Sequence, residues 1–127
     1  MNLLSGMEKF GFSMDGDLLD LPRSVAICRK YGAISVVDEA HATGVVGATG
    51  RGLTEYFHCD APDVTVGTLS KALGAMGGFA AGSRLLSEYL RNKARPFIFS
   101  TSLCPAAAAA CPAACWTTPV ATCPERK

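Results

Sequence analysis

The sequence lacks an excess of charge of either sign. Its 12 Lys and Arg residues almost balance its 11 Asp and Glu residues, so the formal net charge is +1. Proteins that bind nucleic acid or an anionic membrane through charge carry a clear excess of basic residues on the binding face. The composition therefore predicts neither kind of partner and leaves chemistry on small molecules open.

Long apolar runs are also missing. No run approaches the roughly 20 residues that a helix needs to cross a bilayer. The amino-terminal stretch does not combine the basic segment, apolar run and small-residue cleavage site of a secretory signal. We therefore expect a cytoplasmic protein without a membrane partner.

Cysteine is present, but not in the spacing that metal sites use. Cys28 and Cys59 stand alone, and the other cysteines crowd the tail at positions 104, 111, 115 and 123. The tail contains no C-x-x-C pair and no histidine, whereas a zinc site needs such ligands. Disulfide frameworks are rare in the cytosol. We therefore predict free thiols and no metal site.

One lysine stands among small and hydroxylated residues. Residues 66–78 read Val-Gly-Thr-Leu-Ser-Lys-Ala-Leu-Gly-Ala-Met-Gly-Gly, and the lysine is Lys71. Because this apolar stretch contains no carboxylate, we expect Lys71 to be partly buried and easily deprotonated, as suits a Schiff-base lysine. A turn with one surface lysine is the alternative. Thr68 and Ser70 offer hydroxyls to phosphate oxygens, but the G-x-x-x-x-G-K-[ST] order of Walker-type sites is absent.

A second stretch predicts a buried strand that ends in an acid and a histidine. Residues 33–37 are apolar or small, and Asp38 and His41 follow them. Sites in parallel α/β sheets form at the carboxyl ends of strands. Asp38 would be costly to bury as an ion without a cationic partner, and a turn acid is the alternative. His41, taken alone, suits a structural role equally well.

Helical and strand-like patterns alternate along the chain, which favours a parallel sheet covered by helices. Asp20 and Gly32 predict the two ends of a helix that has Pro22 in its first turn. We also expect strands at 64–68, 79–82 and 95–99.

Further helices and loops complete the pattern. Ser83 predicts the start of a helix whose apolar stripe packs in the core. The stripe consists of Leu85, Leu86, Tyr89 and Leu90. We expect residues 43–52 to form a loop under the site and residues 53–58 to form a short helix, with His58 facing solvent.

Five sequence blocks together resemble the α-oxoamine synthases, a family of pyridoxal-phosphate (PLP) enzymes of aminotransferase-like fold. The blocks are Phe-Ser-Met-Asp-Gly-Asp at 12–17, Val-Asp-Glu-Ala-His at 37–41, Thr-Gly-Arg-Gly at 49–52, Gly-Thr-Leu-Ser-Lys at 67–71 and Arg-Pro-Phe-Ile-Phe-Ser-Thr-Ser at 95–102. The resemblance implies a three-layer α/β fold with a mainly parallel sheet. The chain would be a fragment of the large domain of a fold-type I PLP-dependent transferase.

The resemblance also implies which residues act on the ring of PLP. Lys71 bonds the aldehyde carbon, and Asp38 pairs with the protonated ring nitrogen, which keeps the ring a strong electron sink. Ser13 contacts the phenolic oxygen, and His41 contacts either that oxygen or the substrate. The implied catalytic residues are therefore Lys71, Asp38 and His41.

Hydroxyl groups are implied to bind the phosphate of PLP. Thr68 and Ser70 would bind it within the subunit. Thr101 would approach the phosphate of the neighbouring subunit's cofactor, which implies a homodimer. Arg51 is either a surface charge or a residue with a structural or interface role.

The implied reaction joins an amino acid, alanine or glycine, to an acyl-CoA with loss of carbon dioxide and coenzyme A. The blocks at 68–78 and 99–102 are most similar to those of 8-amino-7-oxononanoate synthases of biotin synthesis. Glycine C-acetyltransferases are the alternative, and 5-aminolevulinate synthases and serine palmitoyltransferases share the same core. The choice of substrates stays open.

Chains of this family are about three times as long as this one. We therefore expect residues 1–103 to be part of the PLP-binding large domain. Residues 104–127, rich in Ala, Pro and Cys, are expected to be a low-complexity, truncated or irregular tail. We expect the 127-residue chain alone to be inactive as a synthase, and a non-catalytic remnant is the alternative interpretation.

Overall fold

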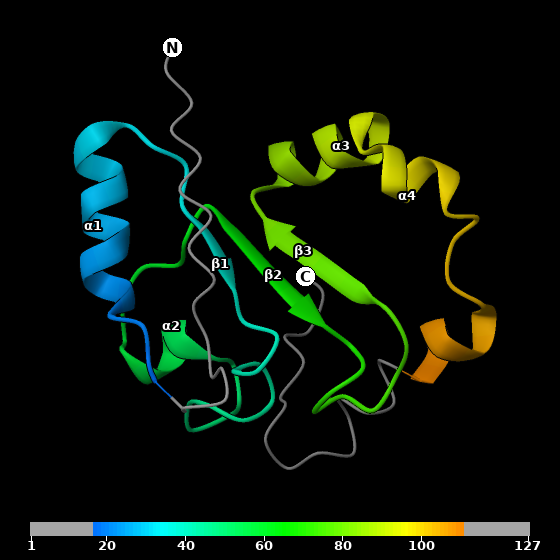
Figure 1. The fold of residues 1–127 in the computed structure, drawn as a ribbon, viewed down its shortest axis with the longest axis horizontal. Helices are drawn as coiled ribbons and strands as arrows, with labels where there is room; N and C mark the ends of the chain where they lie inside the picture. Colours follow the sequence, from blue (N-terminus) through cyan, green and yellow to red (C-terminus); the bar gives the residue numbers. More distant parts are fainter. Residues whose placement is uncertain (1–16, 111–127) are drawn as a thin grey trace.

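A computed structural model describes residues 17–110 of the chain (Figure 1). Its elements are α1 (Leu21–Tyr31), β1 (Val36–Asp38), α2 (Leu53–Tyr56), β2 (Val64–Thr68), β3 (Gly78–Gly82), α3 (Arg84–Lys93) and α4 (Arg95–Phe99). Residues 105–110 are also helical. Ser13 and residues 111–127 lie outside the described residues, so the expectations for them stay predictions.

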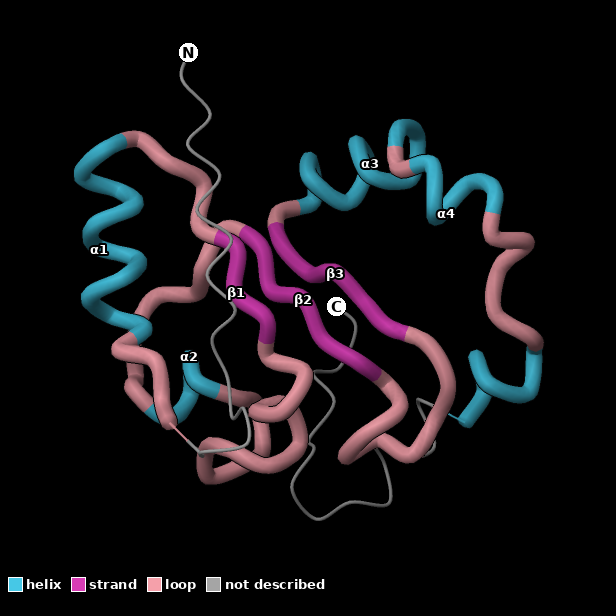
Figure 2. Tube along the Cα trace, viewed as in Figure 1, coloured by secondary structure: helices cyan, strands magenta, loops and turns pink. Residues whose placement is uncertain are grey.

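The three strands form one sheet in the order β1-β2-β3 (Figure 2). β1 and β2 are parallel, with Asp38 opposite Val66. β2 and β3 are antiparallel, with Thr68 opposite Gly78. Residues 69–77 join these two strands directly, and a parallel pairing would need a crossover of about a dozen residues or more. The described part of the expected mainly parallel sheet is therefore mixed.

Local signals set both ends of α1, as the sequence predicts. The Arg23 N–H donates to Asp20 Oδ1 at 3.1 Å and so caps the amino terminus. At the other end Gly32 has a φ of 64°, and its N–H donates to the Arg29 carbonyl at 3.2 Å. Arg29 and Lys30 lie in the last turn, where positive charge complements the helix dipole.

The hydrophobic core lies on the β1 side of the sheet. Its buried members come from α1, β1, the following loop and α2: Leu21, Val25, Val37, Ala42, Val46 and Leu53. Leu19, Phe57 and Cys59 pack against this cluster. Figure 1 shows α1 and α2 on the β1 side of the sheet and α3 and α4 beyond β3. The core therefore supports the segment after β1, which carries predicted site residues.

α3 begins at the predicted residue, but no residue of its apolar stripe is buried. The Leu86 N–H donates to Ser83 Oγ at 3.2 Å, which confirms the predicted cap. Leu85 is 77% exposed and Tyr89 is 61% exposed. Leu86 packs against Gly82 of β3, but no residue of α3 is buried, so the prediction that this stripe lies in the core is wrong for the described structure.

The prediction of a strand at 95–99 is wrong, because these residues form α4. Pro96 lies in the first turn of α4, where a residue needs no N–H partner. The Ile98 N–H donates to the Ala94 carbonyl at 3.0 Å. In a strand the same proline would remove a hydrogen bond between strands, so the segment is better suited to a helix.

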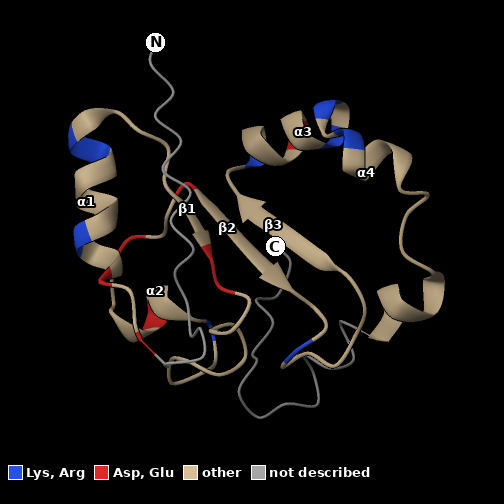
Figure 3. Ribbon diagram, viewed as in Figure 1, with Lys and Arg blue, Asp and Glu red and all other residues tan. Residues whose placement is uncertain are grey.

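Among residues 17–110, charged side chains are exposed or half-buried, and Glu39 alone is fully buried. Figure 3 shows basic residues on α1 and α3 and acidic residues beside β1 and α2. The ion pairs Arg29–Asp60 at 2.6 Å and Arg84–Glu88 at 2.9 Å are exposed, so water and salt screen them and they contribute little to stability. Glu39, in contrast, is 2% exposed.

The described residues contain neither a membrane-spanning helix nor a group of metal ligands. The longest helix between residues 17 and 110 has 11 residues, and no helix there is long and apolar enough to span a membrane. Over the same residues, no group of three or more His, Cys, Asp or Glu side chains could hold a metal ion.

Candidate active site

The carboxyl ends of β1 and β2 meet at one edge of the sheet. Asp38 is the last residue of β1, Thr68 is the last residue of β2, and the two strands run parallel. The segments that carry Asp38 and Lys71 therefore leave the sheet at the same edge, where sites of α/β proteins form. This edge is the candidate active site.

Backbone hydrogen bonds hold the turn after β1. The Glu39 N–H donates to the Val66 carbonyl at 2.7 Å, which extends the contact between the first two strands. The N–H groups of Ala42 and Thr43 both donate to the Glu39 carbonyl at 2.9 Å. His41 lies within this turn and is exposed, so the fold leaves its imidazole accessible at the candidate site.

Asp38 is half-buried at the same edge. The Ala40 N–H donates to Asp38 Oδ1 at 2.8 Å, which is an Asx-type turn contact. Asp38 therefore acts as a turn acid in the described structure, which is the alternative interpretation of this residue. The contact also orients the carboxylate, which keeps further lone pairs for a cationic partner.

Lys71 lies in the turn that joins β2 to β3. The Leu69 N–H donates to the Gly77 carbonyl at 2.9 Å, and the Leu69 carbonyl accepts from the Ala75 N–H at 2.7 Å. The Gly74 N–H donates to the Lys71 carbonyl at 3.0 Å. Lys71 is exposed, so the expected partial burial is wrong for the described structure. The turn extends past the sheet edge, where no described element covers the lysine.

Two hydroxyl groups lie just before Lys71. Thr68 Oγ1 and Ser70 Oγ are 2.8 Å apart, and Thr68 Oγ1 donates to the Gly77 carbonyl at 3.1 Å. Thr68 therefore helps to close the turn. Ser70 is exposed, so the turn presents a hydroxyl and an amine on the same accessible edge.

The two turns are in contact. A Cβ added at Gly44 would lie 2.6 Å from the Ala72 Cβ, so the backbone at Gly44 packs against the residue that follows Lys71. Gly44 also has a φ of 81°, which favours glycine. The loop that carries His41 and the turn that carries Lys71 therefore form one continuous surface.

The segment after α4 reaches the same surface. A Cβ added at Gly77 would lie 2.8 Å from Leu103 Cδ2, so the Leu103 side chain packs on the Lys71 turn. Thr101 is exposed and donates its hydroxyl to the Ser100 carbonyl at 2.6 Å. Its expected contact across a dimer stays a prediction.

Two acids that the sequence analysis did not single out organise the loop below the site. Glu39 Oε1 accepts from the Leu53 N–H at 3.1 Å, and burial raises the pKa of Glu39. Glu55 accepts from the Thr49 hydroxyl at 2.7 Å and from the Thr49 N–H at 2.9 Å. These bonds lower the pKa of Glu55. The block at 49–52 therefore serves as structural support in the described chain.

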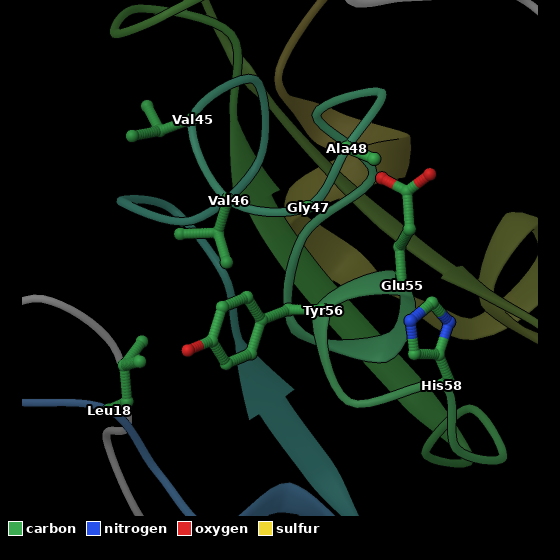
Figure 4. A pocket seen from close by; sticks show the side chains of 8 residues that line it. All are labelled: Leu18, Val45, Val46, Gly47, Ala48, Glu55, Tyr56 and His58. Atoms are coloured by element: carbon green, nitrogen blue, oxygen red, sulfur yellow. The ribbon is translucent and has the colours of Figure 1, made fainter.

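Two cavities lie away from the candidate site. One, of about 530 Å³, opens beside α2, and Figure 4 shows the Tyr56 ring turned toward Leu18 and Val46 in its wall. His58 also lines this cavity and is exposed, as predicted. The other, of about 630 Å³, lies near the amino end of β2, beside Leu86. Neither of these two cavities is lined by a predicted site residue.

Curated proteins match most of this chain. 8-Amino-7-oxononanoate synthase 1 of Bacillus subtilis (strain 168) is 54% identical over 101 residues, which are 79% of this chain and 26% of that protein. The 8-amino-7-oxononanoate synthase of Thermoanaerobacter pseudethanolicus is 53% identical over 100 residues, which are 78% of this chain and 25% of that protein. The chain thus spans about a quarter of the length of these relatives.

Solved structures match the described fold. Serine palmitoyltransferase of Sphingomonas wittichii has a TM-score of 0.76 at 39% identity, over 84% of this chain and 27% of that chain. 8-Amino-7-oxononanoate synthase of Francisella tularensis has a TM-score of 0.66 at 28% identity, over 87% of this chain and 34% of that chain. These matches confirm the expected fold class, part of the large domain of a fold-type I transferase. Residues 11–114 match the family described as aminotransferase class I and II, and the chain belongs to that family.

Proposed function

We propose that this chain supplies the PLP-binding core of an acyltransferase that condenses an amino acid with an acyl-CoA. The observation that carries the proposal is the meeting of two turns at one sheet edge. The Asp38 turn and the Lys71 turn follow parallel strands and touch through Gly44 and Ala72. The 53–54% identity to 8-amino-7-oxononanoate synthases supports this assignment, as does the structural match to serine palmitoyltransferase with PLP.

The side chains at this edge fit the groups of PLP. Lys71 offers an exposed amine for the aldehyde carbon, and Ser70 offers an exposed hydroxyl for the phosphate. Asp38 offers an oriented carboxylate for the protonated ring nitrogen. When bound, PLP supplies an electron-withdrawing ring that stabilises negative charge on the amino-acid Cα.

The remaining predicted residues have supporting roles in the proposal. Thr68 orients the Ser70 hydroxyl and shares the phosphate. His41 and Ser13 contact the phenolic oxygen, or His41 contacts the substrate. Thr101 reaches the cofactor of a second subunit in a homodimer.

In the proposed reaction the residues of this chain hold charge and move protons. The Lys71 amine takes the proton from the amino-acid Cα and later returns a proton to the product. Asp38 keeps a negative charge beside the ring nitrogen. A bond forms between Cα and the acyl carbon, and the thioester C–S bond breaks to release coenzyme A. The carboxyl group then leaves as carbon dioxide, a proton takes its place, and an α-amino ketone remains.

We propose alanine and pimeloyl-CoA as the substrate pair, because the curated relatives at 53–54% identity are 8-amino-7-oxononanoate synthases. Glycine with acetyl-CoA is the alternative. Serine with palmitoyl-CoA is a further candidate, which the TM-score of 0.76 to serine palmitoyltransferase favours.

A segment exchange tests the proposal. Residues 17–110 replace the matching segment of the Bacillus subtilis synthase, and coenzyme A release is measured with each of the three substrate pairs. We expect release from alanine and pimeloyl-CoA, and we expect Lys71→Ala to abolish it. A folded chimaera that binds PLP but releases coenzyme A from none of the pairs would contradict the proposed function.

The 127-residue chain with PLP is the matched control. We expect no more coenzyme A release from this chain than from PLP without protein. The positioning of both substrates can account for roughly 7–11 kcal/mol of such a barrier, and Ser70 and Lys71 are exposed in the described structure. Release well above the PLP control would contradict this expectation.

A further inference from the structure

One buried acid at the site edge has no part in the proposed reaction. Glu39 directly follows Asp38 and is 2% exposed. Neither the Arg29–Asp60 pair nor the Arg84–Glu88 pair includes it. A buried carboxylate is unfavourable unless hydrogen bonds compensate for the loss of water, so the partners of Glu39 indicate what it does.

Glu39 connects three segments of the chain. Its N–H donates to the Val66 carbonyl at 2.7 Å, and its carbonyl accepts from the Ala42 N–H at 2.9 Å. Its side chain accepts from the Leu53 N–H at 3.1 Å. One residue therefore links β2, the turn after β1 and the start of α2.

The Glu39 carboxylate occupies the space that a side chain at position 52 would need. A Cβ added at Gly52 would collide with Glu39 Oε2. Gly52 has a φ of 84°, and its N–H donates to the Val46 carbonyl at 2.9 Å. The position of the Glu39 side chain is therefore fixed by bonds on one side and by close contact on the other.

We propose that Glu39 is a positioning residue whose anchored side chain holds the turn that orients Asp38 and His41. The inference rests on the proposed function for the role of those two residues. The Asp38 carboxylate is oriented by the Ala40 N–H at 2.8 Å, and Glu39 lies between the two. Movement of Glu39 therefore shifts both partners of that bond.

Glu39→Gln tests the proposal, and Glu55→Gln is the matched control. Each change keeps the size of the side chain, removes one acceptor oxygen and places an amide group near backbone donors. Glu39 and Glu55 both accept bonds from backbone N–H groups. Only Glu39 adjoins Asp38, so the two variants separate positioning of the site from general support of the loop.

Hydrogen exchange of single amides, measured by NMR on the 127-residue chain, gives a readout that needs no cofactor. In Glu39→Gln we expect exchange at Leu53 and Ala40 to rise by about tenfold or more. In Glu55→Gln we expect faster exchange at Thr49 and no change at Ala40. Faster exchange at Leu53 with unchanged exchange at Ala40 would overturn the proposal, because Glu39 would then only cap α2.

PLP titration separates this proposal from the proposed function. We expect Glu39→Gln to weaken PLP uptake and Glu55→Gln to leave it unchanged. If the unmodified chain takes up no PLP while the exchange pattern holds, the proposed function fails and the anchoring of Asp38 stands. If Glu39→Gln does not fold, Glu39→Asp keeps the charge but shortens the side chain, which weakens its bond with the Leu53 N–H, and unchanged exchange at Ala40 in that variant would overturn the proposal.

Discussion

At the scale of the residue, two glycines with positive φ differ in ψ and in their surroundings, since ψ is 27° at Gly32 and -159° at Gly52. Gly32 has a φ of 64° and nothing within 4 Å of an added Cβ. Gly52 has a φ of 84°, and an added Cβ would collide with Glu39. The left-handed angles of Gly32 strain a larger residue moderately, whereas the angles of Gly52 are essentially restricted to glycine and its close packing adds to that restriction.

Alanine substitution separates these two effects. We expect Gly32→Ala to lower the free energy of unfolding by about 1–2 kcal/mol, because only the left-handed backbone is strained. We expect Gly52→Ala to lower it by about 2–5 kcal/mol, because the backbone angles of Gly52 lie in a region essentially restricted to glycine and a clash with Glu39 adds to that strain. Urea unfolding measures both values, and equal losses would contradict the close packing at Gly52.

Asp63 gives a pH dependence whose sign follows from its bonds. The Ser35 N–H and hydroxyl donate to Asp63 Oδ2 at 2.8 and 2.7 Å, which lowers the pKa of Asp63 below 3.8 in the folded chain. The stabilisation is therefore complete above pH 3.8 and is lost as the pH falls toward the folded pKa.

Asp63→Asn checks this dependence by urea unfolding at several pH values. The difference in free energy of unfolding between the original chain and the variant should be constant well above pH 3.8 and should shrink below it. Glu55 also has a lowered pKa, but it is present in both chains and cancels. A difference that does not vary with pH would contradict the assigned role of the Ser35 bonds.

At the scale of the element, the sequence predicted the helix ends that depend on neighbouring residues. The caps at Asp20 and Ser83 and the stop at Gly32 act as expected because each depends on residues within one turn. Segment 95–99 was predicted wrongly because a short apolar run has no periodicity that separates helix from strand. Pro96 was the available signal, and it favours the first turn of a helix.

The two capped helices should respond differently to the loss of their caps. We expect Asp20→Ala to lower the global free energy of unfolding by about 1 kcal/mol, because α1 buries Leu21 and Val25 in the core. We expect Ser83→Ala to speed hydrogen exchange at Leu86 with a smaller global effect, because α3 has no buried residue. Equal global losses would show that α3 shares the cooperative core.

At the scale of the whole molecule, the sequence predicted the meeting of Asp38 and Lys71 because parallel strands bring their carboxyl ends together. The exposure of individual side chains could not be predicted from the strand order. Whether Lys71 or Leu85 is covered depends on neighbours distant in sequence, and the described residues leave both exposed. Glu39 was missed for a similar reason, since its partner Leu53 is 14 residues away.

We propose above that this sheet edge binds PLP through Lys71. The most direct test incubates the 127-residue chain with PLP, reduces it with borohydride and maps the labelled peptide by mass spectrometry. We expect the label on Lys71, with Lys71→Arg removing it and with Lys30 and Lys93 unlabelled. A label spread evenly over the lysines, or concentrated on Lys30 or Lys93, would contradict the account.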